Sequence, residues 1–322
     1  MSILEIKKLN VSFKTFRGEI DVLKGINLNI DKNEVVGIIG ESGSGKSVTA
    51  LSIMGLIDKN SGEIKSGEII FDNKDLLKLN EKELCNIRGN NISMIFQEPM
   101  TSLNPVMTIY KQLREVYKIH TPKLKNNCKP AIIDILNKLN ISDAEKVLNK
   151  YPFELSGGIK QRIMIAMAII CNPRLIICDE PTTALDVTTQ AEILKLFKNI
   201  KTENNTSIMF ITHDLGVIAE IAERVVVMYF GNVVEECSAE EFFNNPKHPY
   251  SRDLLLAKPE NFNGRFKTIE GIVPSMYEKL EGCAYYSRCS LREDFCKTES
   301  PDMVELGNGH RVRCFKHNYI GE

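Results

Sequence analysis

An eight-residue glycine-rich segment is the first candidate for chemistry in this sequence. It reads Gly40-Glu41-Ser42-Gly43-Ser44-Gly45-Lys46-Ser47 and fits the pattern G-x-x-x-x-G-K-[ST]. The glycines let the backbone curl so that successive N–H groups can point at phosphate oxygens, and a following helix adds its own N-terminal amides. Lys46 is expected to reach the β- and γ-phosphates of a nucleotide, and the Ser47 hydroxyl to bind Mg²⁺.

The surroundings of this segment separate a phosphate site from a chance glycine-rich turn. An apolar run, Glu34 to Ile39, precedes it, and a helical pattern that begins around Val48 continues through Ile57. A strand, a glycine-rich loop and a helix in this order are the context that a phosphate-binding loop requires. The sequence therefore predicts that ATP binds here, with residues 40–48 in contact with it.

A pair of acidic residues ends a second apolar run, Leu175 to Cys178. Asp179 is expected to hold Mg²⁺ through water, because acids beside a phosphate site need a cation. Glu180 would polarise the water that attacks the γ-phosphate, as a general base or as an orienting group. A solvated strand end explains such a pair equally well when it stands alone, and the phosphate loop makes the catalytic interpretation the stronger one.

A third motif, Leu155 to Arg162, reads LSGGIKQR and leads into a helix. Ser156 suits an N-cap, and Gly157 and Gly158 would expose free helix amides, which makes a second anion site. The structural alternative is an ordinary capped helix.

The elements that must position these motifs alternate between strands and helices. Two strands of a hairpin are expected from Ile3 to Ile30, with the turn near Arg17-Gly18. Further strands are predicted at 92–97, 175–179, 207–212 and 224–229, and a helical insertion from Val106 to Ile170. Strands that alternate with helices favour an α/β domain with a mainly parallel sheet.

Composition limits the class of protein. The chain has 322 residues, with 43% hydrophobic and 26% charged residues and a formal net charge of -1. That length predicts two units, or one domain with an appendage, and the net charge does not suggest a nucleic-acid binder. No apolar run approaches the roughly 18 residues that cross a bilayer, and the N-terminus does not resemble a signal peptide. We expect a cytosolic protein.

From about Ile3 to its end, the sequence resembles the ATPase subunits of ABC transporters. LSGGIKQR resembles the family signature, Gln97 in IFQEP the Q-loop glutamine, Ala184-Leu185-Asp186 the D-loop, and His213 in ITHD the switch histidine. The resemblance implies a P-loop ABC-type ATPase domain over 1–258, with an antiparallel β subdomain and a helical subdomain over about 98–172. A small cysteine-rich C-terminal extension over 259–322 would complete the fold.

The resemblance also implies a head-to-tail dimer of ATPase subunits. Each ATP would lie between the phosphate loop of one subunit and the Ser156-Gly157-Gly158 segment of the other. His213 would contact the γ-phosphate and the attacking water, and Gln97 would contact Mg²⁺ or water. The aromatic residue that stacks on adenine is expected to be Phe16, although strict spacing would place Arg17 there.

Finer details resemble the peptide and nickel importer branch of that family. They are GESGSGKSV, FQEPMTSLNP, ELSGGIKQR, DEPTTALDVTTQ and His248-Pro249-Tyr250. The resemblance implies uptake of short peptides at the cytoplasmic face of the membrane, with a second homologous ATPase, two transmembrane permease subunits and an extracellular binding protein, and without nucleic acid. A nickel importer ATPase and a soluble ABC ATPase remain alternatives. A metal-sensing protein without catalysis is disfavoured by the intact Lys46, Asp179, Glu180 and His213.

Four of the nine cysteines fall near the C-terminus, with the spacing C-x5-C-x6-C-x17-C. These gaps are longer than those of common zinc and ferredoxin sites, so the spacing indicates four thiolate ligands without naming a metal. The resemblance implies a [4Fe–4S] cluster on Cys283, Cys289, Cys296 and Cys314. Zinc is the second possibility, and four unrelated thiols are the third. We expect the metal to have a structural role, because a loop-rich extension buries little core.

Overall fold

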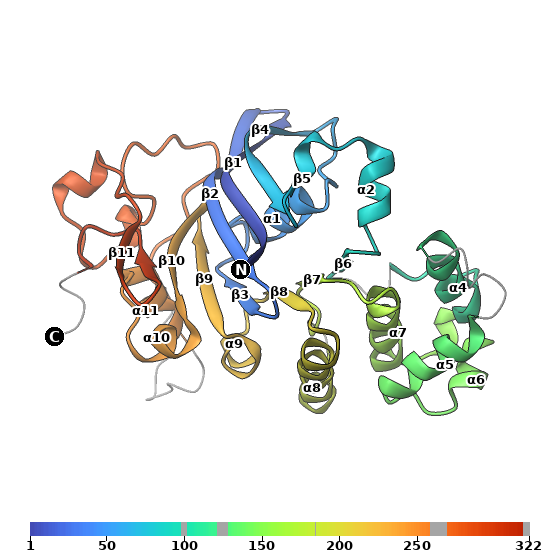
Figure 1. Cartoon of the computed structure of the whole chain (residues 1–322). Coiled ribbons are helices and arrows are strands. Elements are labelled where there is room, and N and C mark those ends of the chain that lie inside the picture. Colours follow the sequence, from blue (N-terminus) through green and yellow to red (C-terminus); the bar gives the residue numbers. More distant parts are fainter. Residues whose placement is uncertain (98–101, 121–127, 184, 258–268, 318–322) are drawn as a thin grey trace. The chain divides into compact units, whose positions relative to one another are not determined.

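The computed structural model describes residues 1–97, 102–120, 128–183, 185–257 and 269–317 (Figure 1). The chain divides into two compact units. Unit 1 comprises Met1, Asp31–Glu34 and Lys78–Ile211, and unit 2 comprises Ser2–Ile30, Val35–Leu77 and Thr212–Glu322. The predicted boundary between residues 258 and 259, the predicted start of the helical subdomain at 98, and Ala184 of the D-loop motif lie outside the described residues.

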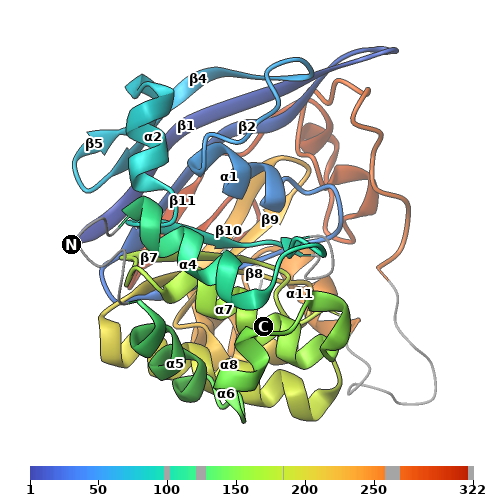
Figure 2. The ribbon, with the colours of Figure 1, turned by 90° about the vertical axis from the view of Figure 1, so that its right-hand side faces the viewer.

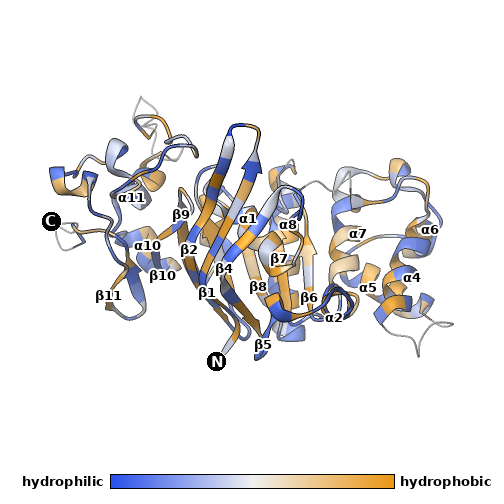
Figure 3. Cartoon of the chain, turned by 90° about the horizontal axis from the view of Figure 1, so that it is seen from above, coloured by the Kyte–Doolittle hydropathy of each residue, from blue (hydrophilic) through white to orange (hydrophobic). Residues whose placement is uncertain are grey.

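An antiparallel sheet in unit 2 begins with the predicted hairpin. Its strands are β1 (Ser2–Thr15), β2 (Gly18–Asp31), β4 (Gly62–Phe71) and β5 (Lys74–Asp75), in the order β2-β1-β4-β5. Buried and less buried residues tend to alternate along β1 and β2. Both hydrophobic and hydrophilic residues occur along these strands (Figure 3). This alternation is expected for strands with one face on a core and one in solvent.

The phosphate-loop motif lies between β3 (Val35–Ile39) and α1 (Lys46–Ile53) in unit 2. All five residues of β3 are buried, and β3 pairs in parallel with β9 (Arg224–Tyr229). The strands β10 (Asn232–Ser238), β12 (His310–Val312) and β11 (Val304–Gly307) continue the sheet in antiparallel pairs. The helix α1 stops four residues before the predicted Ile57, because Gly55 takes a left-handed φ of 60°.

Three further helices belong to the described part of unit 2. They are α9 (Leu215–Ile221), α10 (Ala239–Asn244) and α11 (Pro249–Leu256). Asp214 caps α9 by accepting a hydrogen bond from the N–H of Gly216 at 2.8 Å. This cap fixes the residue that follows His213, so the histidine lies in the short turn between Ile211 and α9.

Unit 1 contains three parallel strands, β6 (Ile92–Ile95), β7 (Leu175–Asp179) and β8 (Ser207–Ile211), in the order β8-β7-β6. Every residue of β7 and β8 is buried, as expected for strands covered on both faces. The predicted strand 92–97 ends at Ile95, so Gln97 lies just beyond the strand. The helix α2 (Glu81–Ile87) precedes β6 and starts with a capping box at Asn80.

The region from Val106 to Ile170 is helical in its described parts, as predicted. It contains α4 (Ile109–His120), α5 (Lys129–Lys138), α6 (Ala144–Leu148) and α7 (Gly157–Ile169), which contact one another (Figure 2). The helix α8 (Val187–Asn204) follows β7 and buries Ile193, Phe197 and Ile200. In the part of the chain that the structure describes, no helix combines the length and apolar character needed to span a bilayer.

Candidate functional site

The phosphate-loop motif forms a tight loop around its own lysine. The Nζ atom of Lys46 donates hydrogen bonds to the carbonyl oxygens of Gly40 and Glu41, at 2.7 and 2.9 Å, and lies 3.4 Å from the Ser44 Oγ. Lys46 is buried, with 7% of its surface exposed. The loop therefore has the curled backbone that the sequence predicts, with the cationic head group inside the curl.

Two glycines of this loop are required by their geometry. Gly40 has a φ of 149°, and a side chain there would collide with the backbone oxygen of Met228 and lie 2.8 Å from the Ser44 Oγ. Gly45 has a φ of 106°, and an added Cβ would lie 2.6 Å from Leu23 Cδ2. Such backbone conformations are open to glycine and costly for other residues.

The predicted catalytic residues of unit 1 come together at the end of β7. The side chain of Gln97 donates to the Oε2 atom of Glu180 at 3.0 Å, and the hydroxyl of Thr183 donates to the same atom at 3.0 Å. Glu180 has a left-handed φ of 50°, which is strained for a residue with a Cβ. Two donors and a strained backbone hold this carboxylate in one orientation, next to the buried Asp179.

The Ser156-Gly157-Gly158 turn begins α7 as expected, but its capping differs from the prediction. The backbone of Ser156 takes an extended conformation and its carbonyl accepts from the N–H of Lys160 at 3.0 Å. Its side chain makes no capping hydrogen bond. Ser156 and Gly157 are exposed, and no described atom lies within 4 Å of a Cβ built on Gly157. The start of α7 at Gly157 thus adjoins open space, and the Ser156 hydroxyl does not cap it.

Phe16 occupies the turn between β1 and β2 and is 91% exposed. The guanidinium carbon of Arg17 lies 5.2 Å from the centre of the Phe16 ring and 6.0 Å from that of Tyr277. The Tyr277 hydroxyl donates to the Thr15 Oγ1 at 3.1 Å, which brings the C-terminal region to this turn. Both candidates for the adenine contact, Phe16 and Arg17, therefore belong to one exposed turn of unit 2.

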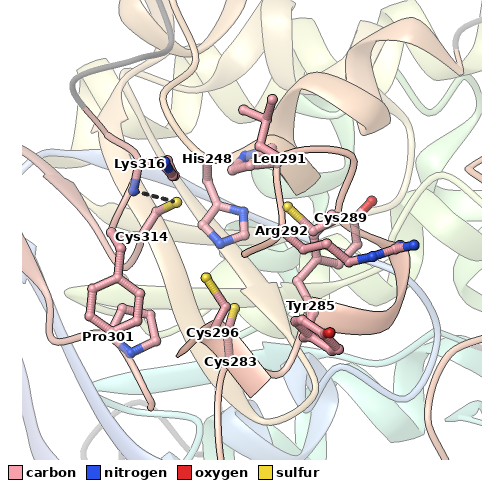
Figure 4. A pocket seen from close by; sticks show the side chains of 13 residues that line it. His248, Cys283, Tyr285, Cys289, Leu291, Arg292, Cys296, Pro301, Cys314 and Lys316 are labelled. Atoms are coloured by element: carbon pink, nitrogen blue, oxygen red, sulfur yellow. Dashed lines mark hydrogen bonds between the residues drawn. The ribbon is translucent and has the colours of Figure 1, made fainter. Parts of the chain in front are cut away.

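The four C-terminal cysteines line a single pocket, into which their sulfur atoms point (Figure 4). All of them are free thiols. Burial raises the pKa of the Cys283 thiol, and raises the pKa of Cys289 and of Cys314 to about 11. The segments cross closely, because the N–H of Cys283 donates to the carbonyl of Cys296 at 2.8 Å. Cysteines up to 31 positions apart in the sequence are thus gathered at one place.

A second group of possible metal ligands was not indicated by the sequence motifs. One ligand atom from each of Glu235, Cys237 and His310 lies within 4.8 Å of the others, and all three residues are buried. Burial alone would raise the pKa of the Glu235 carboxyl, but hydrogen bonds from His310 and from the N–H groups of Lys247 and His248 lower it. The carboxylate is thus stabilised by protein donors, which gives this group a structural role that joins β10, β12 and the start of α11.

An ion pair at the phosphate loop was not indicated by any sequence motif. Arg288, which directly precedes Cys289, donates to both carboxylate oxygens of Glu41, at 2.6 and 3.1 Å. The residues are 247 positions apart, and no periodicity or spacing links them. Glu41 was predicted to contact phosphate through its backbone, which is compatible with a side chain that turns to Arg288.

Comparisons with known proteins agree with this architecture. Residues 23–183 match the sequence model of the ABC transporter family, and residues 234–296 match that of the oligopeptide/dipeptide transporter C-terminal region. The dimeric structure of MJ0796, a bacterial ABC transporter cassette, superposes with a TM-score of 0.63 at 31% sequence identity and covers 73% of this chain and 98% of that one. The fold and the phosphate loop thus define an ATP-hydrolysing cassette, and the chain belongs to the ABC transporter family.

Within that family, similarity extends over almost the whole chain to proteins with peptide-related names. The probable peptide ABC transporter ATP-binding protein y4tR of Sinorhizobium fredii is 44% identical over 99% of this chain and 96% of its own length. The oligopeptide transport ATP-binding protein AppD of Bacillus subtilis is 44% identical over 99% and 98%. The dipeptide transport ATP-binding protein DppD of the same organism is 43% identical over 99% and 96%.

Proposed function

We propose that this chain is the ATP-hydrolysing subunit of an importer that carries short peptides across the cell membrane. The observation that carries the proposal is similarity over 99% of the chain, at 43–44% identity, to proteins named for peptide, oligopeptide and dipeptide transport. These names favour a peptide cargo over nickel. The match to an oligopeptide/dipeptide transporter C-terminal region argues against a soluble ABC ATPase that acts on ribosomes or DNA.

In this proposal the phosphate loop binds the nucleotide. Amides of residues 40–48 and the ammonium of Lys46 hold the β- and γ-phosphates, and exchange their contacts within the loop for contacts with phosphate oxygens. Ser47, Gln97 and Asp179 are our candidates for Mg²⁺, which neutralises phosphate charge when bound. Phe16 is our candidate for the ring that stacks on adenine. Its ring is exposed and is not packed in the core, so it is accessible to a base.

Glu180 is our candidate for the group that acts on the attacking water. Its Oε2 atom accepts from Gln97 and Thr183, so the carboxylate is oriented before the substrate arrives. A carboxylate held in this way can orient the water or accept its proton as the bond to the γ-phosphate forms. His213 is assigned to the γ-phosphate and the same water by the family motif in which it stands.

The turn at Ser156, Gly157 and Gly158, in which the first two residues are exposed, supports a head-to-tail pair of ATPase subunits. In such a pair this turn would contact the γ-phosphate of ATP bound to the other subunit, with its helix amides and dipole directed at the anion. A phosphate held from both sides joins the subunits until hydrolysis releases them. Two permease subunits and an extracellular binding protein would complete an importer whose ATPase pair lies at the cytoplasmic face of the membrane.

The experiment that tests this function replaces Glu180 by Gln. We expect the variant to bind ATP with nearly unchanged affinity while turnover falls at least about 100-fold, because the amide cannot accept a proton. Glu203→Gln, an exposed change at the end of α8, is the matched control and should keep full turnover. Near-normal hydrolysis by Glu180→Gln would show that the attacking water is handled by another residue.

The cargo is tested with the complete importer reconstituted in vesicles. Uptake of a labelled short peptide should require ATP and should stop with Glu180→Gln in this chain. ATP-dependent uptake of nickel, without uptake of peptides, would replace the peptide assignment by the nickel one and leave the ATPase assignment standing.

We also propose that Cys283, Cys289, Cys296 and Cys314 hold a [4Fe–4S] cluster. A tetrahedral zinc ion with Zn–S bonds of about 2.3 Å would hold its sulfurs about 3.8 Å apart. Among the described residues, no three of these thiols lie within 4.8 Å of one another, so the pocket suits a wider group. When bound, a cluster supplies covalent cross-links between loops that have little core of their own.

Metal analysis of the anaerobically purified chain tests the cluster. We expect about four iron and four sulfide per chain and a brown absorbance, all of which Cys289→Ser should remove. Cys85→Ser, at an exposed cysteine of unit 1, is the control and should keep them. Stoichiometric zinc in the unmutated chain would refute the iron–sulfur assignment.

A further inference from the structure

The ion pair between Arg288 and Glu41 joins the cysteine-bearing segment to the phosphate loop. The guanidinium approaches the carboxylate with two nitrogens, and the Arg288 side chain is only 3% exposed while that of Glu41 is 28% exposed. Bidentate ion pairs of this kind fix the geometry of both side chains as well as pairing their charges. Removal of one partner from a buried pair is destabilising, because the other charge stays buried without compensation. Because the Arg288 side chain is almost fully buried, this is not an exposed surface ion pair.

Arg288 is held on several sides by unit 2. Its Nε donates to the carbonyl of Glu270 at 3.1 Å, and its guanidinium carbon lies 5.9 Å from the ring centre of Tyr229 and 5.8 Å from that of Tyr285. The side chain therefore has a defined path from its backbone to Glu41. It can transmit a displacement of the segment that carries it.

Glu41 in turn is built into the frame of the phosphate loop. Its N–H donates to the Tyr250 hydroxyl at 2.8 Å, and its carbonyl accepts from the Nζ of Lys46 at 2.9 Å. A carboxylate at the second position of a loop that receives a triphosphate would repel its ligand if it were unpaired. Arg288 supplies the opposite charge and holds the carboxylate in one orientation.

The cysteines lie on either side of the short helical turn that presents Arg288. This 3-10 turn spans Tyr286–Arg288, between Cys283 and Cys289. The N–H of Tyr286 donates to the carbonyl of Cys283 at 3.0 Å, and the N–H groups of Arg288 and Cys289 donate to the carbonyl of Tyr285, at 3.1 and 3.0 Å. The position of Arg288 thus depends on how these two cysteines are held.

We propose that Arg288 is a positioning residue of the phosphate loop, through which the order of the cysteine-bearing segment sets the affinity for ATP. The proposal rests on the assignment of Gly40 to Ser47 as the ATP site. It makes the C-terminal region part of the ATP-binding apparatus and not an independent appendage.

The first test measures binding of MgATP to the full chain by equilibrium titration. Arg288→Met should weaken binding about tenfold, because it leaves the Glu41 charge uncompensated beside the phosphates. Glu41→Gln should weaken it less than about threefold, and the double variant Glu41→Gln/Arg288→Met should bind ATP more tightly than Arg288→Met alone. Arg252→Met, which removes an exposed arginine of α11, is the matched control and should bind as the unmutated chain.

Two results would overturn the proposal. One is unchanged ATP binding by Arg288→Met, and the other is a double variant as weak as that single one, which would indicate general damage instead of uncompensated charge. Thermal unfolding of each variant separates the cases, and Arg288→Lys, which keeps the charge but not the two-pronged geometry, should fall between Arg288→Met and the unmutated chain.

The second test addresses the cysteine segment. Cys289→Ser should weaken ATP binding and speed hydrogen exchange of the amides of residues 40–46, but it should have little further effect in the Glu41→Gln/Arg288→Met background. Equal effects in both backgrounds would refute the coupling. Lys46→Ala separates the two proposals, because unchanged ATP binding in that variant would refute the ATP site itself, whereas lost binding there with unchanged binding in Arg288→Met would refute only the role of Arg288.

Discussion

Two glycine-bearing turns precede helices in this chain, and they are built in opposite ways. The phosphate loop before α1 is filled by its own lysine and enclosed by neighbouring atoms, with Ser44, Gly45 and Lys46 all buried. The turn before α7 is exposed, and the side chain of Ser156 makes no capping hydrogen bond. The first arrangement suits the half of the proposed site that binds the nucleotide within its own chain, and the second suits the half that contacts the nucleotide of a neighbouring subunit.

This contrast explains why glycine is present in each turn. At Gly40 the backbone conformation and the nearby Met228 oxygen leave no room for a side chain. At Gly157 the space is open, so the absence of a side chain serves no contact within the described chain. A glycine that the fold does not need points to close approach by something outside the chain.

The largest effect is expected from Gly40→Ala. The added methyl would collide with the Met228 carbonyl at a φ of 149°, so the loop must shift and its amides lose their alignment. We expect ATP binding to weaken more than about 100-fold, measured by titration with a fluorescent ATP analogue.

Gly43→Ala is the matched control within the same loop. No described atom lies within 4 Å of a Cβ at Gly43, and only its φ of 78° opposes the change, at a cost of about 1–2 kcal/mol. Equal losses of ATP binding in the two variants would show that the enclosure at Gly40 does not matter. The contrast between an enclosed phosphate loop and an open turn before α7 would then have no functional meaning at the loop.

Local patterns were enough to predict the phosphate loop, because its glycines, its lysine and the strand before it are adjacent in the sequence. Long-range pairs needed other information. The contact between Gln97 and Glu180 spans 83 positions and was not predicted, since the family resemblance assigned Gln97 only to Mg²⁺ or water. The pair of Glu41 and Arg288 spans 247 positions and was missed, because single charged residues carry no signal of their partner.

The direction of individual side chains was also not predictable from the sequence. Serine before a helix favours an N-cap on average, but Ser156 does not cap α7 with its side chain. An exposed hydroxyl can choose among several rotamers at little cost, so its direction is not set by residue type. Asp186 and Asp214, also at helix starts, do cap α8 and α9. The turn before α7 thus lacks the side-chain cap that the turns before α8 and α9 have.

A smaller effect, on a different measurement, is expected from Gly157→Glu. The carboxylate would lie where the neighbouring subunit's γ-phosphate is proposed to bind, and like charges repel. ATPase turnover of the assembled importer should fall about thirtyfold, which corresponds to about 2 kcal/mol. Binding of ATP to the isolated chain should stay within about twofold, because that site is the phosphate loop.

Gly157→Ala provides the control for charge. It fits the open space and favours the helix, so turnover should fall much less than with glutamate. If both variants kept full turnover, the exposed turn would have no part in the ATPase site, and its openness would need another explanation.

The smallest effect is expected from Phe16→Ala, and it tests whether exposure alone marks a contact with an outside partner. Phe16 and Gly157 are both exposed, yet we assign Phe16 to the nucleotide of its own chain. Loss of a stacking ring should weaken ATP binding about fivefold, or about 1 kcal/mol, and should leave the melting temperature unchanged because the ring packs against little. Phe153→Ala, which removes a 71% exposed ring in unit 1, should leave ATP binding unaltered. If Arg17→Ala weakens binding and Phe16→Ala does not, the adenine contact belongs to Arg17, and exposure of an aromatic ring is not a sufficient guide at this turn.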